Sequence, residues 1–136
     1  MSTYSVIAYR GFELPKEYEN LIYAKWLRSF RFGNDYMKLA EPSSYYAAYH
    51  RYIENILKTA DCTVRLAVLT EDKDVVLGFS VARGATLDYV HVQKEQRRMG
   101  IGTSLVPDGI ATISHLTKTG LTIWGSKYGH WRFDPF

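Results

Sequence analysis

The chain has 136 residues, which at about 100 to 200 residues per domain predicts a single domain. Its 17 Lys and Arg residues against 14 Asp and Glu residues give a formal net charge of +3, too weak by itself to indicate a nucleic-acid or membrane partner. The first residues lack a cationic flank followed by an apolar run, no apolar run approaches the roughly 18 residues of a membrane span, and Cys62 is the one cysteine. We therefore expect no signal peptide, no internal disulfide and a soluble protein of the cytoplasm.

The first sixty residues predict one strand followed by two helices. Strand-forming residues fill Tyr4–Arg10. Apolar residues at near-helical spacing then predict a helix over about 15–30. A second helix begins at Ser43 or Ser44, either of which can cap it. One face of that second helix carries the residues Tyr45, Tyr49, Tyr52, Ile53, Ile56 and Leu57.

From Cys62 the hydrophobic pattern changes to the alternation of strands. One run covers 62–68 and ends before the charged turn 71–74, and a second run covers 75–81. A third run over 86–92 follows closely after Gly84. Because only short turns connect these runs, they predict a meander of three antiparallel strands.

The last third of the chain predicts a helix and a strand. The helix begins at Gly100 and Gly102, and its later apolar positions at helical spacing are Ile110, Ile113 and Leu116. Pro107 lies inside this segment, where it removes a hydrogen bond and clashes with a preceding carbonyl, so we expect a kink or a break. A final strand is predicted over 121–124.

This order of elements predicts an α/β fold with a mixed, mainly antiparallel sheet flanked by helices. A strand–helix–strand crossover is almost always right-handed, so strands 86–92 and 121–124 are expected to lie side by side and parallel. We expect a cleft at the carboxyl ends of these two strands.

A short motif, Arg97-x-x-Gly100-x-Gly102, links the predicted strand 86–92 to the predicted third helix. Glycines let backbone N–H groups approach a ligand without an intervening Cβ, and the helix that follows directs its positive end to the same place. The motif therefore suits a pyrophosphate, although an ordinary strand-to-helix turn is the alternative. The dinucleotide fingerprint and the Gly-Lys-Ser/Thr phosphate loop do not occur, which disfavours a nicotinamide cofactor or ATP.

In this motif and in element order the chain resembles the GCN5-related N-acetyltransferase (GNAT) superfamily. Arg97, Gly100 and Gly102 match the family's acetyl-coenzyme A motif of Arg or Gln, two residues, Gly, one residue, and Gly or Ala. The resemblance covers roughly 62–121, and the N-terminal strand and two helices agree with it. It implies one GNAT-like acetyltransferase domain over 1–136, shortened at its C-terminus, since family members continue with a further helix and two strands. A compact, atypical member would suit a phage or mobile element.

The resemblance implies acetyl-coenzyme A as co-substrate and no metal. Backbone N–H groups of 98–103 would hold the pyrophosphate, and 90–92 would pair with the pantetheine arm as an added strand. In the family, a bulge splays the fourth and fifth strands so that the acetyl end enters between them. A backbone N–H near Val92 would then stabilise the oxyanion. The implied coenzyme site comprises Val90, His91, Val92, Arg97, Arg98, Met99, Gly100, Ile101, Gly102 and Thr103.

Acetylation of an amine needs a base for the nucleophile and an acid for the departing thiolate. The resemblance implies Asp88 as the base, directly or through water, and a paired or solvated strand carboxylate is the alternative. Tyr128 follows the fifth predicted strand on the side from which the family supplies a tyrosine acid, and Ser126 is its substitute. The histidines lack metal-ligand spacing and are expected in structural or surface roles: His50, His91, His115 and His130. Cys62 is assigned no chemistry.

The expected function is transfer of an acetyl group from acetyl-coenzyme A to an unidentified amine of a small molecule, protein or RNA. Two alternatives stay open: a nucleic-acid-modifying enzyme, and a non-catalytic module that binds a partner. A homodimer could complete the shortened fold. Basic and aromatic residues interleave over the first two helices and their loop: Tyr23, Lys25, Arg28, Arg31, Phe32, Tyr36, Lys38, Tyr46, His50 and Arg51. This mixture suits a nucleic-acid acceptor or an acidic protein segment, and a solvated helix face with core aromatics is the alternative.

Overall fold

The computed structural model describes residues 4–34, 36–93, 96, 100–115 and 131–134. Its elements in chain order are β1 (Tyr4–Arg10), η1 (Gly11–Glu13), α1 (Lys16–Gly33), η2 (Met37–Leu39), α2 (Pro42–Lys58), β2 (Cys62–Leu69), β3 (Val76–Arg83), β4 (Thr86–Val92), α3 (Ile101–Leu105), β5 (Thr112–Ile113) and β6 (Arg132–Phe133). The predicted first strand, the two N-terminal helices and the three-strand meander are confirmed. The predicted third helix differs from the structure.

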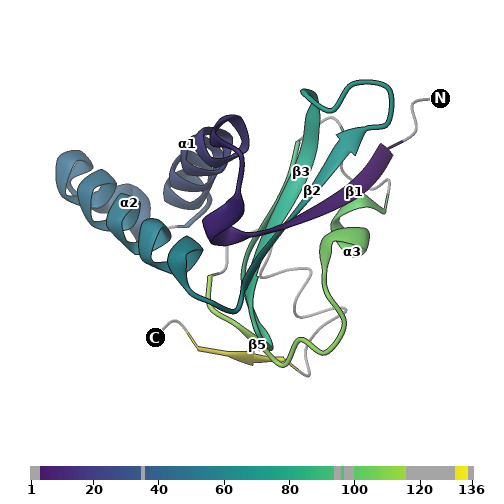
Figure 1. Cartoon of the computed structure of the whole chain (residues 1–136). Coiled ribbons are helices and arrows are strands. Elements are labelled where there is room, and N and C mark those ends of the chain that lie inside the picture. Colours follow the sequence, from purple (N-terminus) through teal and green to yellow (C-terminus); the bar gives the residue numbers. More distant parts are fainter. Residues whose placement is uncertain (1–3, 35, 94–95, 97–99, 116–130, 135–136) are drawn as a thin grey trace.

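The strands form one six-stranded sheet whose spatial order follows the chain, β1 to β6. The first four pair as an antiparallel meander, whereas β4 with β5 and β5 with β6 pair in parallel. Helices α1 and α2 lie on one face of this sheet and α3 lies on the other (Figure 1). The prediction of an α/β fold with a mixed, mainly antiparallel sheet flanked by helices is therefore confirmed.

Two buried layers result from this arrangement. The main core fills the space between the sheet and helices α1 and α2, and its fully buried members include Ile22, Trp26, Ile53, Leu66 and Phe79. A smaller cluster under α3 joins Ala67, Leu77, Ile101 and Leu105. Because β3 is covered on both faces, seven of its eight residues are buried, which explains its nearly continuous apolar run.

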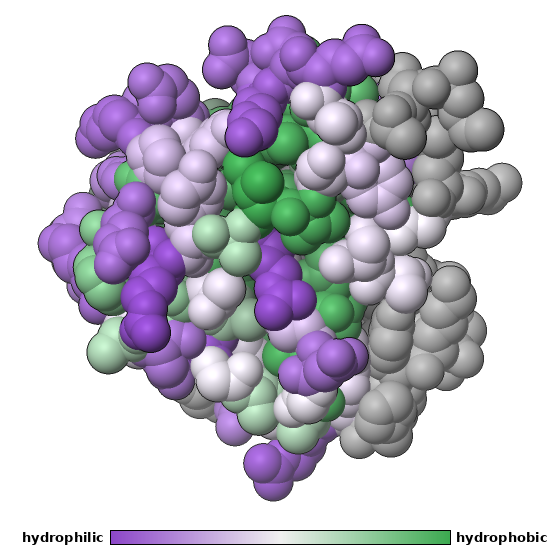
Figure 2. Space-filling model, turned by 45° about the vertical axis from the view of Figure 1, so that its right-hand side comes forward, coloured by the Kyte–Doolittle hydropathy of each residue, from purple (hydrophilic) through white to green (hydrophobic). Residues whose placement is uncertain are grey.

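The surface agrees with this layering. On the face turned forward in Figure 2, which brings the α3 side of the molecule toward the viewer, apolar residues gather in a central strip among polar ones. Among the described helices, none combines the length and the apolar character that crossing a bilayer requires.

The N-terminus of α2 is capped by Glu41, so the prediction of Ser43 or Ser44 as the cap is wrong. Pro42 occupies the first helical turn, where its missing N–H costs no hydrogen bond, and this places the start of the helix before the serines. The carboxylate of Glu41 accepts the backbone N–H of Ser43 at 3.2 Å and of Ser44 at 2.7 Å. The hydrogen bond from the Ser43 hydroxyl is the main cause that lowers the pKa of Glu41 to about 2.

Replacing Glu41 with alanine is expected to lower the melting temperature by about 3–5 °C at pH 7, because two helix N–H groups lose their acceptor. Glu41→Asp, which keeps a capping carboxylate, is the control. The folded pKa lies below the usual value of 4.5, so this contribution is complete above pH 4.5 and declines as the pH falls toward 2. A difference between wild type and Glu41→Ala that stays constant from pH 7 to pH 2.5 in thermal melts would contradict this assignment.

The third helix is short, and its predicted continuation through Ile113 is wrong. Helix α3 ends at Leu105, and Val106 before Pro107 is extended, as residues that precede proline usually are. The break expected at Pro107 is confirmed. After a turn, Ile113 lies on strand β5 and packs in a third cluster with Leu87, Ile110 and Trp131. Apolar spacing that suited a helix therefore belongs to a turn and a strand.

The C-terminal strands of the sheet were not predicted. The strand expected over 121–124 lies outside the described residues, as does Leu116. In the described part of the chain the parallel neighbour of β4 is β5, in the register Thr86 to Thr112 and Leu87 to Ile113. The aromatic tail supplies β6, which pairs with β5. A strand of two residues is too short to show an alternation of apolar and polar residues, so only its pairing with a neighbouring strand identifies it.

Candidate functional site

Strand β4 contains a bulge at Asp88. Val81 of β3 pairs with Tyr89, and the next residue, Ala82, pairs with Leu87, so Asp88 is the extra residue on β4. The pairing of β4 with β5 covers Thr86 and Leu87, immediately before this bulge. A bulge twists and bends its strand locally. The structure thus has, at Asp88, the kind of feature that the resemblance implied for the fourth strand.

The predicted glycine motif forms a turn that leads into α3. Gly100 has a φ of 80°, in the left-handed region that favours glycine, and a Cβ added there would meet no heavy atom of the described residues within 4 Å. A Cβ on Gly102 would lie 3.7 Å from Cγ2 of Val92, at the end of β4. Buried Ile101 anchors the turn on the sheet, while Thr103 is exposed. The backbone of this turn is therefore open to a ligand beside the carboxyl end of β4.

The other predicted coenzyme residues divide into two groups. Val90, His91 and Val92 are half-buried on β4, and the structure brings Val92 next to the glycine turn. The ring of His91 lies 5.7 Å from that of Phe79. Arg97, Arg98 and Met99 lie outside the described residues, as do the predicted acids Tyr128 and Ser126. The described part of this site, an open glycine turn beside a strand end, fits a long ligand that carries phosphate groups.

Asp88 is fully buried and held by an ion pair. Nε of Arg83 donates to one carboxylate oxygen at 2.7 Å, and Nη2 of Arg83 donates to the other at 2.8 Å. The hydroxyl of Ser114 donates to that second oxygen at 2.7 Å. Both oxygens of Asp88 therefore accept hydrogen bonds from fixed neighbours. This geometry suits a positioning role better than the base expected from the resemblance.

The two residues that follow β5, Ser114 and His115, extend this series of hydrogen bonds. Oγ of Ser114 lies 2.8 Å from Nδ1 of His115. Since the single hydroxyl hydrogen of Ser114 goes to Asp88, the hydrogen of this second bond belongs to Nδ1. Burial lowers the pKa of His115 to about 4, so the ring is neutral at pH 7 and its Nε2 carries a lone pair.

Ser114 was not predicted as a functional residue, and His115 was expected only in a structural or surface role. Asp88 and Ser114 are 26 positions apart, and no local spacing rule connects them. They meet because β5 pairs in parallel with the first residues of β4, and Ser114 N–H donates to the carbonyl of Leu87. The only local signal, a Ser-His pair after the apolar Ile113, was hidden by the helical spacing of the segment.

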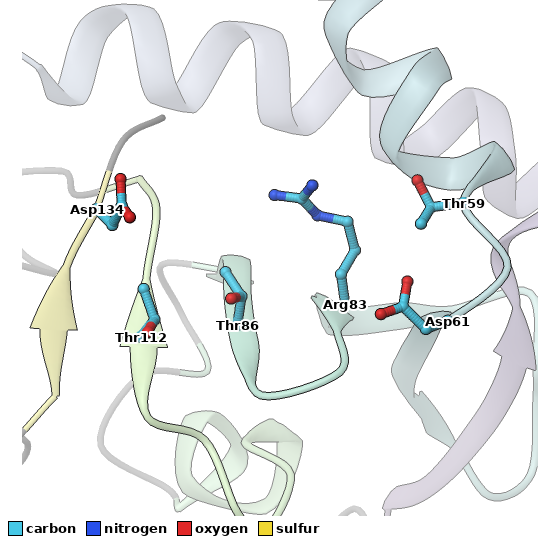
Figure 3. Close-up of a pocket in the computed structure, with 6 residues that line it drawn as sticks. All are labelled: Thr59, Asp61, Arg83, Thr86, Thr112 and Asp134. Carbon is cyan, nitrogen blue, oxygen red and sulfur yellow. The ribbon is translucent and has the colours of Figure 1, made fainter.

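One cavity lies at each end of this series of hydrogen bonds. The first has a volume of about 360 Å³ and is lined by Thr59, Asp61, Arg83, Thr86, Thr112 and Asp134. Figure 3 shows the guanidinium of Arg83 extending between the residues of the two sides. The second has a volume of about 260 Å³ and is lined by Phe30, Asn34, Tyr36, Met37, Tyr49, Ser114, His115 and Phe133. One cavity is thus polar and charged, and the other is mainly aromatic.

The described residues show no group of three or more His, Cys, Asp or Glu side chains that could hold a metal ion. Cys62 is buried, and burial raises the pKa of its thiol to about 12. A thiol with so high a pKa is a poor nucleophile at neutral pH.

Comparisons with known proteins connect this geometry to one fold. No protein-family model matches the sequence, and no curated protein sequence matches it significantly. A Staphylococcus aureus protein assigned to the GNAT family of acetyltransferases superposes with a TM-score of 0.52 and 13% identity, over 95% of this chain and 97% of that one. A Pyrococcus furiosus protein assigned as an acetyl transferase superposes with a TM-score of 0.50 and 15% identity, over 97% and 80%.

The apo form of Escherichia coli YjaB is 22% identical, with a TM-score of 0.48, over 76% of this chain. The match spans 61% of the length of YjaB. The likeness to the Staphylococcus aureus and Pyrococcus furiosus proteins concerns architecture, and it agrees with the element order predicted from the sequence. The chain therefore has the fold of the GNAT superfamily of N-acetyltransferases.

Proposed function

We propose that the protein is an N-acetyltransferase that transfers an acetyl group from acetyl-coenzyme A to an amine. The observation that carries this proposal is the position of the glycine turn. The turn lies beside Val92 at the carboxyl end of β4, which is the place that the acetyl-coenzyme A motif occupies in the resemblance. The bulge at Asp88 and the parallel pairing of β4 with β5 support it further.

In this proposal the residues of the turn and of β4 hold the coenzyme. Backbone N–H groups of Gly100, Ile101, Gly102 and Thr103, together with Arg97, Arg98 and Met99, face the pyrophosphate. The backbone of Val90, His91 and Val92 lies along the pantetheine arm. When bound, the coenzyme supplies an acetyl thioester, an activated acyl group.

The proposed proton-transfer groups follow from the resemblance and from the geometry at Asp88. Tyr128 is proposed as the acid that protonates the departing thiolate, and Ser126 as its alternative. Asp88 is proposed to hold Ser114 in place, because Arg83 and Ser114 already occupy its two oxygens. Replacing Tyr128 with phenylalanine should then lower turnover far more than coenzyme affinity.

The proposal is tested by a matched pair of substitutions at Gly102. Gly102→Trp is expected to weaken binding of acetyl-coenzyme A at least about tenfold, because the indole would cover the backbone beside Val92. Gly102→Ala is expected to bind like wild type, since its Cβ makes an ordinary van der Waals contact at 3.7 Å. Isothermal titration with acetyl-coenzyme A and with coenzyme A measures both.

Unchanged affinity in a folded Gly102→Trp protein would remove the turn from the coenzyme site. If wild type binds acetyl-coenzyme A, a screen of amines for acetylated product by mass spectrometry follows. Coenzyme binding without transfer to any amine would leave a coenzyme-binding module and overturn the enzymatic proposal.

A further inference from the structure

The aromatic cavity of about 260 Å³ is lined mainly by rings and by few polar groups. Its floor is buried, with Phe30 at 4%, Ser114 at 3% and His115 at 7% exposure, whereas Tyr36 at 81% and Phe133 at 45% are open to solvent. None of the described lining residues carries a formal charge when His115 is neutral. A cavity with ring walls, few polar groups and one open side favours a compact apolar ligand with one polar end.

The imidazole of His115 is held rigidly at the floor of this cavity. The rings of Trp26, Phe30, Tyr49 and Tyr52 surround it with centroid distances of 5.0 to 6.0 Å. On the remaining side, Oγ of Ser114 accepts a hydrogen bond from Nδ1, and the Ser114 hydroxyl donates a hydrogen bond to Asp88. This chain of bonds fixes the ring tautomer, so Nε2 is the nitrogen that can accept a hydrogen bond from a ligand.

We propose that this cavity binds the acceptor of the reaction as an uncharged primary amine on an apolar, ring-sized body, with Nε2 of His115 accepting an amine N–H. The proposal rests on the acetyltransferase function proposed above, and it names the acceptor class. The body of the amine lies against Phe30 and Tyr49, and the amine group lies at His115, next to the Ser114–Asp88 pair at the bulge of β4.

The charge of the walls favours the neutral amine over the ammonium. Burying an ammonium without a carboxylate partner carries a large desolvation cost that contacts with ring faces offset only in part, and no described lining residue supplies a carboxylate. Asp88 itself is covered by its bonds to Arg83 and Ser114. An uncharged amine keeps the lone pair that attacks a thioester, so the cavity selects the reactive form.

A change of affinity with pH reports on the protonation of the amine only if the groups around His115 keep their own charge over the same pH range. They are Asp88 on β4, joined in an ion pair to Arg83 on β3, and Tyr49 and Tyr52 on α2, while α1 contributes the uncharged rings of Trp26 and Phe30. His115 titrates near pH 4, and burial raises the pKa of both tyrosines above 10. Between pH 6.5 and 8.5 neither His115 nor these tyrosines change charge.

The test uses benzylamine as the probe with the full chain in the absence of coenzyme. Alkylamines have a pKa near 10, so their neutral fraction rises about tenfold per pH unit below that value. Affinity by isothermal titration is therefore expected to rise about 100-fold from pH 6.5 to pH 8.5. Benzyltrimethylammonium, which keeps the ring but has a fixed charge and no N–H, is expected not to bind.

A second measurement follows the imidazole itself. The Nε2 resonance of ¹⁵N-labelled His115 is expected to shift on addition of benzylamine, while the Nδ1–H tautomer is retained. His115→Phe keeps a ring in the aromatic cluster but removes Nε2, and it is expected to bind benzylamine about tenfold more weakly. If this variant does not fold, the pH dependence, the fixed-charge analogue and the Nε2 shift still decide the question on wild-type protein.

Three results would overturn the inference: no binding of benzylamine at pH 8.5, equal binding of the trimethylammonium analogue, or affinity independent of pH. The Gly102→Trp and Gly102→Ala variants test the transferase proposal independently of the amine site, because they report on coenzyme binding alone. Coenzyme binding without benzylamine binding would refute the acceptor site and leave the transferase proposal standing. Neutral-amine binding without any coenzyme binding would refute the transferase and keep the amine site.

Discussion

Replacing Arg83 with methionine is expected to destabilise the protein by about 3 kcal/mol, because it leaves the carboxylate of Asp88 buried without its cation. The two groups share hydrogen bonds of 2.7 and 2.8 Å, and the Asp88 side chain is fully buried. The side chain of Arg83 is 32% exposed, so solvent screens the pair partly, and we expect the lower end of the range known for buried pairs. Urea unfolding of the variant measures the loss.

Replacing the other member of the pair, Asp88, is expected to destabilise the protein less. Asp88→Asn keeps the size of the side chain and an oxygen that accepts from Ser114, and it leaves Arg83, which can reach water. A loss of about 1 to 2 kcal/mol is expected. The double variant Arg83→Met/Asp88→Asn should be more stable than Arg83→Met alone, because no charge is then buried without a partner. Additive losses in the double variant would show that the pair is not coupled.

Replacing Gly11 with alanine is expected to destabilise the protein by about 3 kcal/mol or more, at the upper end for overpacking. A Cβ on Gly11 would overlap the carbonyl oxygen and carbon of Leu57, which belong to the last turn of α2, and would also meet Sγ of Cys62 at 3.0 Å. Backbone atoms cannot move aside as a flexible side chain can. The turn after β1 and the end of α2 would therefore have to separate.

Gly102→Ala serves as the matched control for this prediction. Its Cβ makes an ordinary contact with a side-chain methyl, so the melting temperature should change little, whereas Gly11→Ala should melt well below it. Equal melting temperatures for the two alanine variants in calorimetry would mean that α2 does not pack against Gly11 as closely as the structure has it.

Much of the fold followed from local patterns. Alternating apolar residues predicted β2, and short runs of strand-forming residues between turns predicted β3 and β4. Helical spacing predicted α1 and α2 because one face of each packs on the sheet. The break near Pro107 followed from the chemistry of proline alone. The glycine motif predicted a turn between β4 and α3, and the structure has Gly100 there in a left-handed conformation.

Local patterns failed where a neighbour far along the chain decides the conformation. The spacing of Ile110 and Ile113 suited a helix, but pairing with β4 and packing against Trp131 stabilise a strand instead. The cap of α2 moved to Glu41 because Pro42 displaced the helix start and a carboxylate can accept from two N–H groups at once.

The sequence by itself determined the layers of the fold, the order of its main elements and the glycine turn beside β4, because each depends on residues close together in the chain. Tertiary structure alone decided the two short C-terminal strands, the bond from Ser114 to Asp88 and the aromatic cavity around His115. These features join residues that are distant in sequence, and only the packing of the helices on the sheet brings such residues together.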